Sequence, residues 1–492
     1  MGEVVIAVDL GAGSLRAGAI DGHGRCLSSA SAALQADEPR PGWSEIDPER
    51  WWKALRRCVG RVLNGLPRNS HPQGVCLSGL TRAQVVLDRD LTPLRPAILF
   101  RDRRAESLVA RVAAHFPARN PADAITAFHP LARLAWLARA EPELFRRAAY
   151  VLEPKDFFNA RLTGIVAADS VTYSRFDALR PPKSPPAWLQ RCMDFLRLPR
   201  RSPWIAVGRI VADEAPFDRL RCLPVFAGAM DTWAAVTGSG AVREGQAYDV
   251  AGTTEAVGLL SRKRRVVPGL VPVWWGEGLH QAGGPTQIGA DGIAWCHRTV
   301  RVRGALAAAV ERVAARDPSE GFPLLLPYLA GERVPVWRSD VRGAFHGVSR
   351  DHGPDDLLWA ALEGSAHAVR DILSIASAGT GEAVREVRVS GGGARSDAWC
   401  QLKADVASVP FVRSEHAETG LAGAAMAAAV GLGWYSDLPA AAWRMCPVDR
   451  VFEPRKKFAA LYARRAALYR HAKAAALAEA DATAASRRKG VL

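Results

Sequence analysis

The 492-residue chain has little that would suit a zinc protein or a membrane protein. Its eight cysteines are scattered, and no two of them form a C-x-x-C pair, which argues against a zinc site. No apolar run reaches membrane-spanning length, and Glu3 and Asp9 interrupt the apolar start where a signal peptide would need an unbroken core. We therefore expect a soluble, cytoplasmic protein that does not interact with membranes.

Two common nucleotide-binding patterns are also missing. No segment matches G-x-x-x-x-G-K-[ST], and Gly391-Gly392-Gly393 lacks the spacing of a Rossmann fingerprint. The formal net charge of +15 could suggest a nucleic-acid partner, but the basic residues are spread along the chain and no RNA- or DNA-binding motif is present. We expect a solvated basic surface and no nucleic-acid partner; the positive field would help to attract small anions.

The length and an internal repetition predict two domains. A chain of 492 residues is too long for one core. Each half opens on a hairpin with a small-residue turn, Gly11-Ala12-Gly13 in the first half and Gly252-Thr253-Thr254 in the second. We expect a duplicated α/β domain with a cleft between the copies, with boundaries at 1–243 and 244–480 and a frayed tail at 481–492. The expected strands are 4–8, 14–20, 26–31, 74–78, 248–251, 255–260 and 386–390, and the expected helices begin at 48 or span 103–115, 130–140, 354–378, 395–408 and 418–430, with a last helix from about 455.

The first hairpin combines an acid with bare backbone N–H groups. Asp9 ends an apolar strand immediately before the turn that Gly11 opens. Glycine permits positive φ and close approach of a ligand, and successive N–H groups form an anion nest. An acid beside such a nest makes sense if a divalent cation bridges it to phosphate. Taken alone, the segment is explained equally well by an ordinary hairpin with a polar turn.

A longer set of residues resembles the FGGY family of ATP-dependent carbohydrate kinases. The most specific match is the segment 343–348 with 356–363, which is similar to a family signature, and 326–333 also matches. A further signature around 133–137 is weaker, because the family usually has Lys at the position of Arg133. The resemblance covers residues from about 4 to about 470. It implies two actin-like, ribonuclease H-like domains, ATP and Mg²⁺ as ligands, and phosphorylation of a primary hydroxyl on a small carbohydrate.

The resemblance also implies roles for individual residues. Asp231 matches the acid that accepts the proton of the substrate hydroxyl, although an Asp at this point could simply cap a helix, and both uses can hold. Asp9 matches an acid near Mg²⁺, and Arg16 a basic residue that reaches the phosphates. Ala12 stands where many members have Thr, so a hydroxyl contact is lost while the N–H remains. The implied ATP-binding residues are Gly11, Ala12, Gly13, Ser14, Arg16, Gly252, Thr253, Thr254, Gly392, Gly393, Ala394 and Asp397.

The substrate-facing segment departs from the family pattern. Xylulokinase-like members carry Gln-Met-His after Ser-Gly, whereas Ser78-Gly79 is followed here by Leu80-Thr81-Arg82. Arg82 could bind vicinal hydroxyls or a carboxylate, or could be a surface arginine. Trp233 could wall the pocket or pack within its helix. The implied substrate-binding residues are Thr81, Arg82, Phe100, Asp102, Thr232 and Trp233.

The overall pattern makes a ketopentose such as xylulose the first expectation for the substrate. A sugar acid is the alternative because of Arg82, and a polyol also stays open. A non-catalytic nucleotide- or sugar-binding scaffold would be a different class of protein, but it would lack the proton acceptor that Asp231 supplies. The sequence leaves open whether the protein is a homodimer.

Overall fold

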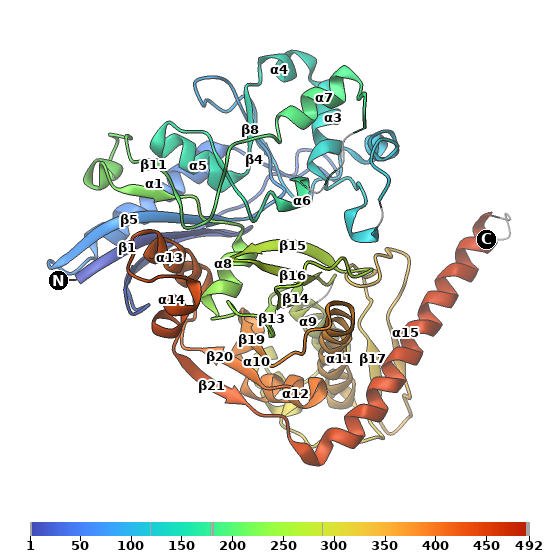
Figure 1. Cartoon of the computed structure of the whole chain (residues 1–492). Coiled ribbons are helices and arrows are strands. Elements are labelled where there is room, and N and C mark those ends of the chain that lie inside the picture. Colours follow the sequence, from blue (N-terminus) through green and yellow to red (C-terminus); the bar gives the residue numbers. More distant parts are fainter. Residues whose placement is uncertain (1, 119, 178, 180–181, 288, 489–492) are drawn as a thin grey trace.

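The computed structural model describes residues 2–118, 120–177, 179, 182–287 and 289–488, which form two lobes (Figure 1). The first lobe is built on a six-stranded sheet in the order β11-β12-β5-β1-β2-β3. Its strands are β1 (Gly2–Leu10), β2 (Ser14–Asp21), β3 (Cys26–Ala33), β5 (Ser70–Gly79), β11 (Ala206–Arg209) and β12 (Pro224–Phe226).

The second lobe repeats this pattern in a seven-stranded sheet, β15-β16-β14-β13-β19-β20-β21. In each sheet, an antiparallel hairpin is followed by two parallel strand pairs and then by one antiparallel edge strand. The parallel pairs are β1/β5 and β5/β12 in the first sheet and β13/β19 and β19/β20 in the second. The antiparallel edge strands are β11 and β21. The prediction of a duplicated α/β fold is confirmed. The strands are β13 (Gln246–Ala251), β14 (Glu255–Ser261), β15 (Val271–Gly276), β16 (Leu279–Pro285), β19 (Glu386–Ser390), β20 (Phe411–Ser414) and β21 (Val448–Phe452).

Two helices lie between the sheets and pack closely on one another, α8 (Asp231–Gly238) and α13 (Thr419–Gly431) (Figure 1). α13 contacts β1 and β5 of the first lobe, although it comes from the second half of the chain. A Cβ on Gly423 would lie 1.9 Å from the Ala234 carbonyl oxygen, and one on Gly238 would lie 1.9 Å from that of Thr419. Only glycine permits the two helices to approach this closely. Because α13 also contacts β1, this packing holds α8 in position relative to β1.

Most of the remaining elements follow local sequence signals. In α1 (Pro48–Asn64), Asp47 accepts a hydrogen bond from the Glu49 N–H, and Trp51 and Trp52 are buried on one face. The other helices are α2 (Val109–Ala113), α3 (Pro130–Ala140), α4 (Pro142–Arg147), α5 (Pro154–Thr163), α6 (Ser174–Asp177), α7 (Ala187–Asp194), α9 (Ala290–Thr299), α10 (Leu306–Ala314), α11 (Pro354–Thr380), α12 (Asp397–Ala407), α14 (Leu438–Met445) and α15 (Ala459–Arg488). Short strands are β4 (Glu45–Ile46), β6 (Val85–Leu87), β7 (Ala97–Ile98), β8 (Tyr150–Leu152), β9 (Ala168–Asp169), β10 (Arg200–Arg201), β17 (Leu324–Leu326) and β18 (Ala344–His346).

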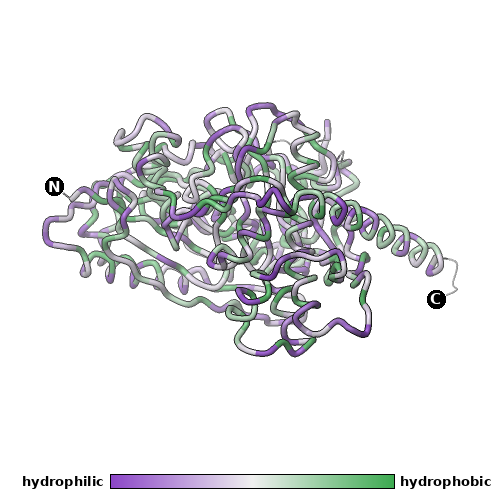
Figure 2. The backbone as a smooth tube through the Cα atoms, turned by 90° about the horizontal axis from the view of Figure 1, so that it is seen from below, coloured by the Kyte–Doolittle hydropathy of each residue, from purple (hydrophilic) through white to green (hydrophobic). Residues whose placement is uncertain are grey.

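Two predicted elements are wrong in extent. The expected helix 103–115 is only a 3₁₀ turn at Glu106–Leu108 followed by α2, because the Arg104 N–H is bonded to the Asp102 side chain instead of entering a helix. Residues 481–488, expected to be frayed, are part of α15, and Asp481 pairs with Arg338 at 2.7 Å; residues 489–492 of the expected tail lie outside the described residues. Figure 2 shows the end of this helix extending away from the rest of the molecule.

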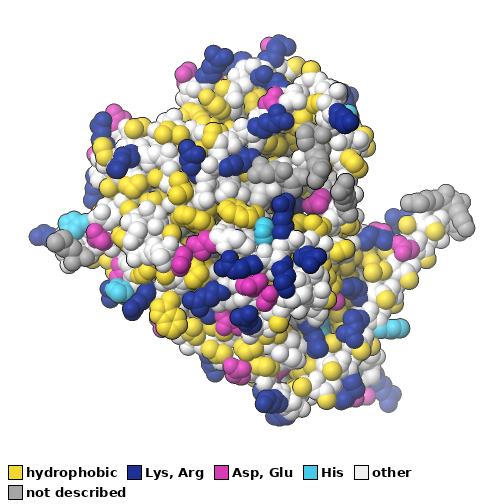
Figure 3. All heavy atoms as spheres, in the orientation of Figure 1, with side chains coloured by type: hydrophobic (Ala, Val, Ile, Leu, Met, Phe, Trp, Pro, Cys, Tyr) yellow, Lys and Arg dark blue, Asp and Glu magenta, His cyan; other side chains and the backbone are white. Residues whose placement is uncertain are grey.

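The surface and the cysteines agree with the composition. All eight cysteines are free, and Cys76 is buried in the core. On the face shown in Figure 3, Lys and Arg side chains occur on both lobes with acidic side chains among them. Among the described residues, no helix is both long and apolar enough to cross a bilayer.

Candidate active site

The first hairpin exposes its turn near the space between the lobes. Asp9 pairs with Arg16 across β1 and β2, and the Gly11 N–H donates to the Ser14 carbonyl at 2.9 Å to close the turn. Ala12 and Gly13 are exposed. Arg16 is paired with Glu418 at 3.0 Å, but both side chains are more than 40% exposed, so this ion pair is weak and a phosphate could displace it.

Two half-buried carboxylates, Asp9 and Asp231, lie near one another at the ends of β1 and α8. Burial and then the charge of Asp231 raise the pKa of Asp9 to about 7, while the hydrogen bond from Ser78 Oγ, 3.0 Å from Asp9 Oδ1, opposes the shift. Burial also raises the pKa of Asp231, against hydrogen bonds from the N–H (2.6 Å) and hydroxyl (3.2 Å) of Thr232. Both groups are therefore poised to take up a proton or a cation.

Asp9 also suits a Mg²⁺ ion. Among the described residues no group of three or more His, Cys, Asp or Glu side chains could hold a metal on its own. Mg²⁺, however, commonly binds one or two carboxylates together with phosphate oxygens and water. Among the described residues, the Asp9 carboxylate accepts one hydrogen bond, from Ser78, and burial is the first cause of its raised pKa. The donor set fits an ion that arrives with the nucleotide.

The second hairpin presents exposed Thr253 and Thr254 in the same way. The start of α9 supports it: Gly289 and Asp291 donate backbone N–H groups to the Thr253 carbonyl at 3.1 and 3.2 Å. A Cβ on Gly289 would lie 2.8 Å from the Glu255 nitrogen, so glycine is required there.

A buried ion cluster supports the base of this hairpin, and sequence reasoning missed it. Lys403 Nζ donates to Asp249 Oδ2 at 2.6 Å and to Glu255 Oε1 at 2.5 Å, joining α12 to β13 and β14. Because all three side chains are buried, removal of one would leave an uncompensated charge.

The glycine turn expected to meet adenosine adjoins the end of β13. Gly391 has φ +84°, and a Cβ there would lie 2.6 Å from the Ala251 carbonyl oxygen. Nothing lies within 4 Å of the position that a Cβ on Gly392 would occupy, so this turn has open space beside it. Asp397 is already engaged, since it pairs with Arg413 at 2.7 Å and with Arg450.

A cavity of about 300 Å³ lies between the lobes. It is lined by Thr81, Arg82, Phe116, Pro117, Ala118, Ala122, Asp123, Ala124, Thr126, His129, Thr172, Arg175, Phe176, Leu179, Met230 and Trp337. Met230 precedes Asp231, and Trp337 is contributed by the second lobe. A small ligand held here would therefore contact both lobes and Met230, the chain neighbour of Asp231; Asp231 itself is not among the lining residues.

Comparison with known proteins shows the family of the chain. The family model "FGGY family of carbohydrate kinases, N-terminal domain" matches residues 4–179, and its C-terminal counterpart matches residues 247–432. The chain belongs to the FGGY family of carbohydrate kinases. A xylulose kinase from Staphylococcus epidermidis is 27% identical over 484 residues, covering 95% of this chain and 96% of the relative. The crystal structure of a xylulose kinase from Rhodospirillum rubrum has a TM-score of 0.85 with 26% identity, covering 96% of this chain and 98% of that one. The fold of a gluconate kinase from Lactobacillus acidophilus is similar, with a TM-score of 0.84, 22% identity and coverage of 96% and 98%.

The expected family, fold class and enzyme class are thus confirmed, and this FGGY kinase is a carbohydrate phosphotransferase that uses ATP. The structure places Thr81 and Arg82 on the cavity wall. Thr232 orients Asp231 through two hydrogen bonds. Trp233 is fully buried and donates its Nε1–H to the Trp275 carbonyl at 2.8 Å, so it packs in the core.

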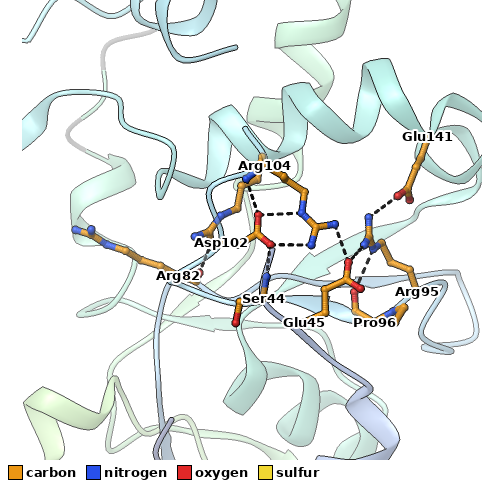
Figure 4. A network of polar contacts seen from close by, with 9 residues as sticks. Ser44, Glu45, Arg82, Arg95, Pro96, Asp102, Arg104 and Glu141 are labelled. Carbon is orange, nitrogen blue, oxygen red and sulfur yellow. Dashed lines mark hydrogen bonds and ion pairs between the residues drawn. The ribbon is translucent and has the colours of Figure 1, made fainter. Parts of the chain in front are cut away.

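The structure does not bring Asp102 or Phe100 to the cavity. Asp102 is fully buried, and its oxygens accept hydrogen bonds from the backbone N–H of Ser44 (2.6 Å) and from the backbone and side chain of Arg104 (Figure 4). Arg104 and Arg95 extend this network to Glu45 and Glu141. The expectation that Asp102 accepts hydrogen bonds from the sugar is corrected, because its acceptor positions are used internally. Phe100 is half-buried and is not among the lining residues.

Sequence reasoning missed the other polar and aromatic residues that line the cavity, which are Phe116, Asp123, Thr126, His129, Thr172, Arg175, Phe176 and Trp337. None of them stands in a motif that points to a carbohydrate. One local signal could have drawn attention to His129. It caps the N-terminus of α3 and is followed by Pro130, close to the segment around Arg133 that resembles the family signature.

Proposed function

We propose that this kinase transfers the γ-phosphate of ATP to a primary hydroxyl of a small open-chain carbohydrate, with Asp231 as the base. One observation carries the proposal: the Asp231 carboxylate follows Met230, which lines the cavity, and lies near Asp9 at the first phosphate hairpin. Residue 231 is thus adjacent in the chain to the cavity lining and close in space to the acid of the first phosphate hairpin.

The chemistry follows from this placement. A carbohydrate hydroxyl is a poor nucleophile at neutral pH, and a carboxylate within hydrogen-bond reach can accept its proton during transfer. The raised pKa of Asp231 makes it a better acceptor than an exposed aspartate. Backbone N–H groups of the Gly11–Gly13 and Gly252–Thr254 turns, with Arg16, would hold and neutralise the phosphates. Asp9 would hold Mg²⁺, which when bound neutralises phosphate charge.

Two acceptors deserve to be compared first. The xylulose kinases among its relatives favour a ketopentose such as xylulose. Arg82 on the cavity wall favours a sugar acid.

A coupled ADP-release assay over pentuloses, hexuloses, polyols and aldonates tests the activity. The Asp231→Asn variant should lose roughly 10³-fold or more in kcat on the best acceptor, because general-base assistance is removed, while its Kd for ATP stays unchanged. Asp218→Asn, which alters an exposed aspartate, is the matched control and should behave like the parent protein. Turnover retained by Asp231→Asn would refute its role as base.

A further inference from the structure

The cavity carries two guanidinium groups, those of Arg82 and Arg175. Arg82 follows β5, and Arg175 lies on α6. Among the residues that the structure describes, the Arg82 guanidinium has no hydrogen-bond or ion-pair partner, and Figure 4 shows it pointing away from the Asp102 network. Arg175 donates one Nη2–H to the Ala122 carbonyl at 3.0 Å, which leaves further donors available.

Among the described residues, neither guanidinium forms a direct ion pair with a carboxylate, although the charges of Glu153 and Asp123 act on Arg82 and Arg175 respectively. Glu153 accepts the backbone N–H groups of Arg82 and Ala83, both at 3.1 Å, rather than the Arg82 side chain. Burial raises the pKa of Glu153 to about 8, so this group is mostly neutral at pH 7. Burial and the charge of Arg82 lower the pKa of Arg175 to about 9. Asp123 is the one carboxylate among the described lining residues; it is exposed and interacts with the charge of Arg175 without a direct ion pair.

The other polar groups of the cavity suit hydroxyls. His129 Nδ1 accepts the Leu131 N–H at 3.2 Å, and burial with the charges of Arg82 and Arg175 lowers the His129 pKa to about 3, so the ring is neutral and its Nε2 carries a proton. Thr172 Oγ1 is buried and has no hydrogen-bond partner within the described part of the chain. A polyhydroxylated chain would satisfy both.

We propose that the acceptor of this kinase is a sugar acid whose carboxylate binds between Arg82 and Arg175. A carboxylate would supply negative charge beside these two guanidinium groups, and guanidinium groups bind a carboxylate through paired, charge-assisted hydrogen bonds. The volume of about 300 Å³ is at the small end for ligand pockets and suits one monosaccharide unit. The inference rests on the proposed kinase function, because it concerns the same site.

The test compares acceptors that differ only at one carbon: each five- and six-carbon aldonate against the alditol of the same configuration, with ketopentoses alongside. The kcat/KM of the best aldonate should exceed those of its alditol and of every ketopentose by at least about tenfold, since a charge-assisted hydrogen bond is lost without the carboxylate. Arg175→Met should raise the aldonate KM by about 10- to 100-fold and change the alditol KM little. Arg175→Lys should recover part of the loss, and Arg57→Met, at an exposed site, is the control.

The outcomes separate this inference from the kinase function. Ketopentoses or alditols that equal the aldonates would overturn the sugar-acid assignment and leave the kinase function intact. A preference for sugar phosphates would also overturn it, because the cavity would then bind phosphate instead. Absence of ADP release with every acceptor would defeat the kinase function itself. If Arg175→Met does not fold, titration calorimetry of the wild-type protein decides: an aldonate that binds no more tightly than its alditol contradicts the proposal.

Discussion

At the residue scale, Asp231 and Asp102, which the family resemblance both assigns to the substrate, lie in different environments. Asp231 is half-buried, and among the described residues only Thr232 donates hydrogen bonds to its carboxylate. Both Asp102 oxygens, by contrast, accept hydrogen bonds in the core. The family resemblance pointed to both as substrate-facing. Arg104, whose side chain donates hydrogen bonds to Asp102, is only two residues away in the chain. The sequence, however, does not show in which direction the Arg104 side chain points. The hairpin turns could be predicted from their small residues, because tight turns that a ligand approaches closely favour glycine and other small side chains.

Glu153 gives the residue scale a pH-dependent prediction. Its pKa is raised by burial to about 8, from an ordinary value of about 4.3. Because the folded-state pKa is the higher one, its contribution to stability is full below about pH 4.3 and is lost as the pH rises to 8. Glu153→Gln does not titrate, although its amide oxygen can accept only one of the two backbone N–H groups that Glu153 accepts. The difference in free energy of unfolding between Glu153→Gln and the wild type should therefore shift in favour of the variant by on the order of 1 kcal/mol per pH unit between pH 5 and 8. Denaturant unfolding at each pH measures this difference.

The exposed Glu143 supplies the control for this measurement. Its side chain is 82% exposed, so Glu143→Gln should follow the wild-type pH dependence. Parallel curves for wild type and Glu153→Gln would show that Glu153 is ionised in the folded protein throughout this range.

At the element scale, local signals predicted most of the fold. The strand expected at 386–390 coincides with β19, and the helix expected from residue 48 is α1, because Asp and Pro at its start satisfy and pre-shape the first turn. The packing of α13 on α8 was not predictable. It depends on Gly238 meeting Thr419 and on Gly423 meeting Ala234, contacts between segments about 180 residues apart along the chain.

Gly423→Ala tests this packing. The new Cβ would lie 1.9 Å from the Ala234 oxygen, so α8 or α13 must shift. We expect a loss of about 1–3 kcal/mol in stability and, because α8 begins at Asp231, a fall in kcat with little change in Kd for ATP.

The matched control is another helical glycine. At Gly60 in α1 the nearest atom to a new Cβ is 3.7 Å away, on Pro216, so Gly60→Ala should be neutral or stabilising by about 0.5–1 kcal/mol. Thermal unfolding and steady-state kinetics measure both variants. Equal behaviour of the two would mean that the close contact between α8 and α13 does not position Asp231.

At the scale of the whole molecule, the duplication was predictable and the composition of the cavity was not. Both halves open on a hairpin with a small-residue turn, a repetition visible in the sequence. The cavity instead combines residues 81–179, Met230 and Trp337, which only the arrangement of the two lobes brings together. Because Trp337 comes from the second lobe, we expect the acceptor to draw the lobes together and exclude water from the transfer.

The most direct test of the whole account is a crystal structure of the protein with a non-hydrolysable ATP analogue, Mg²⁺ and the best acceptor. We predict that the turns at Gly11–Gly13 and Gly252–Thr254 contact the phosphates. We also predict that the acceptor hydroxyl oxygen lies in line with the γ-phosphorus and within hydrogen-bond distance of the Asp231 carboxylate. An acceptor bound with its hydroxyl away from Asp231, or a triphosphate held by neither turn, would contradict the account.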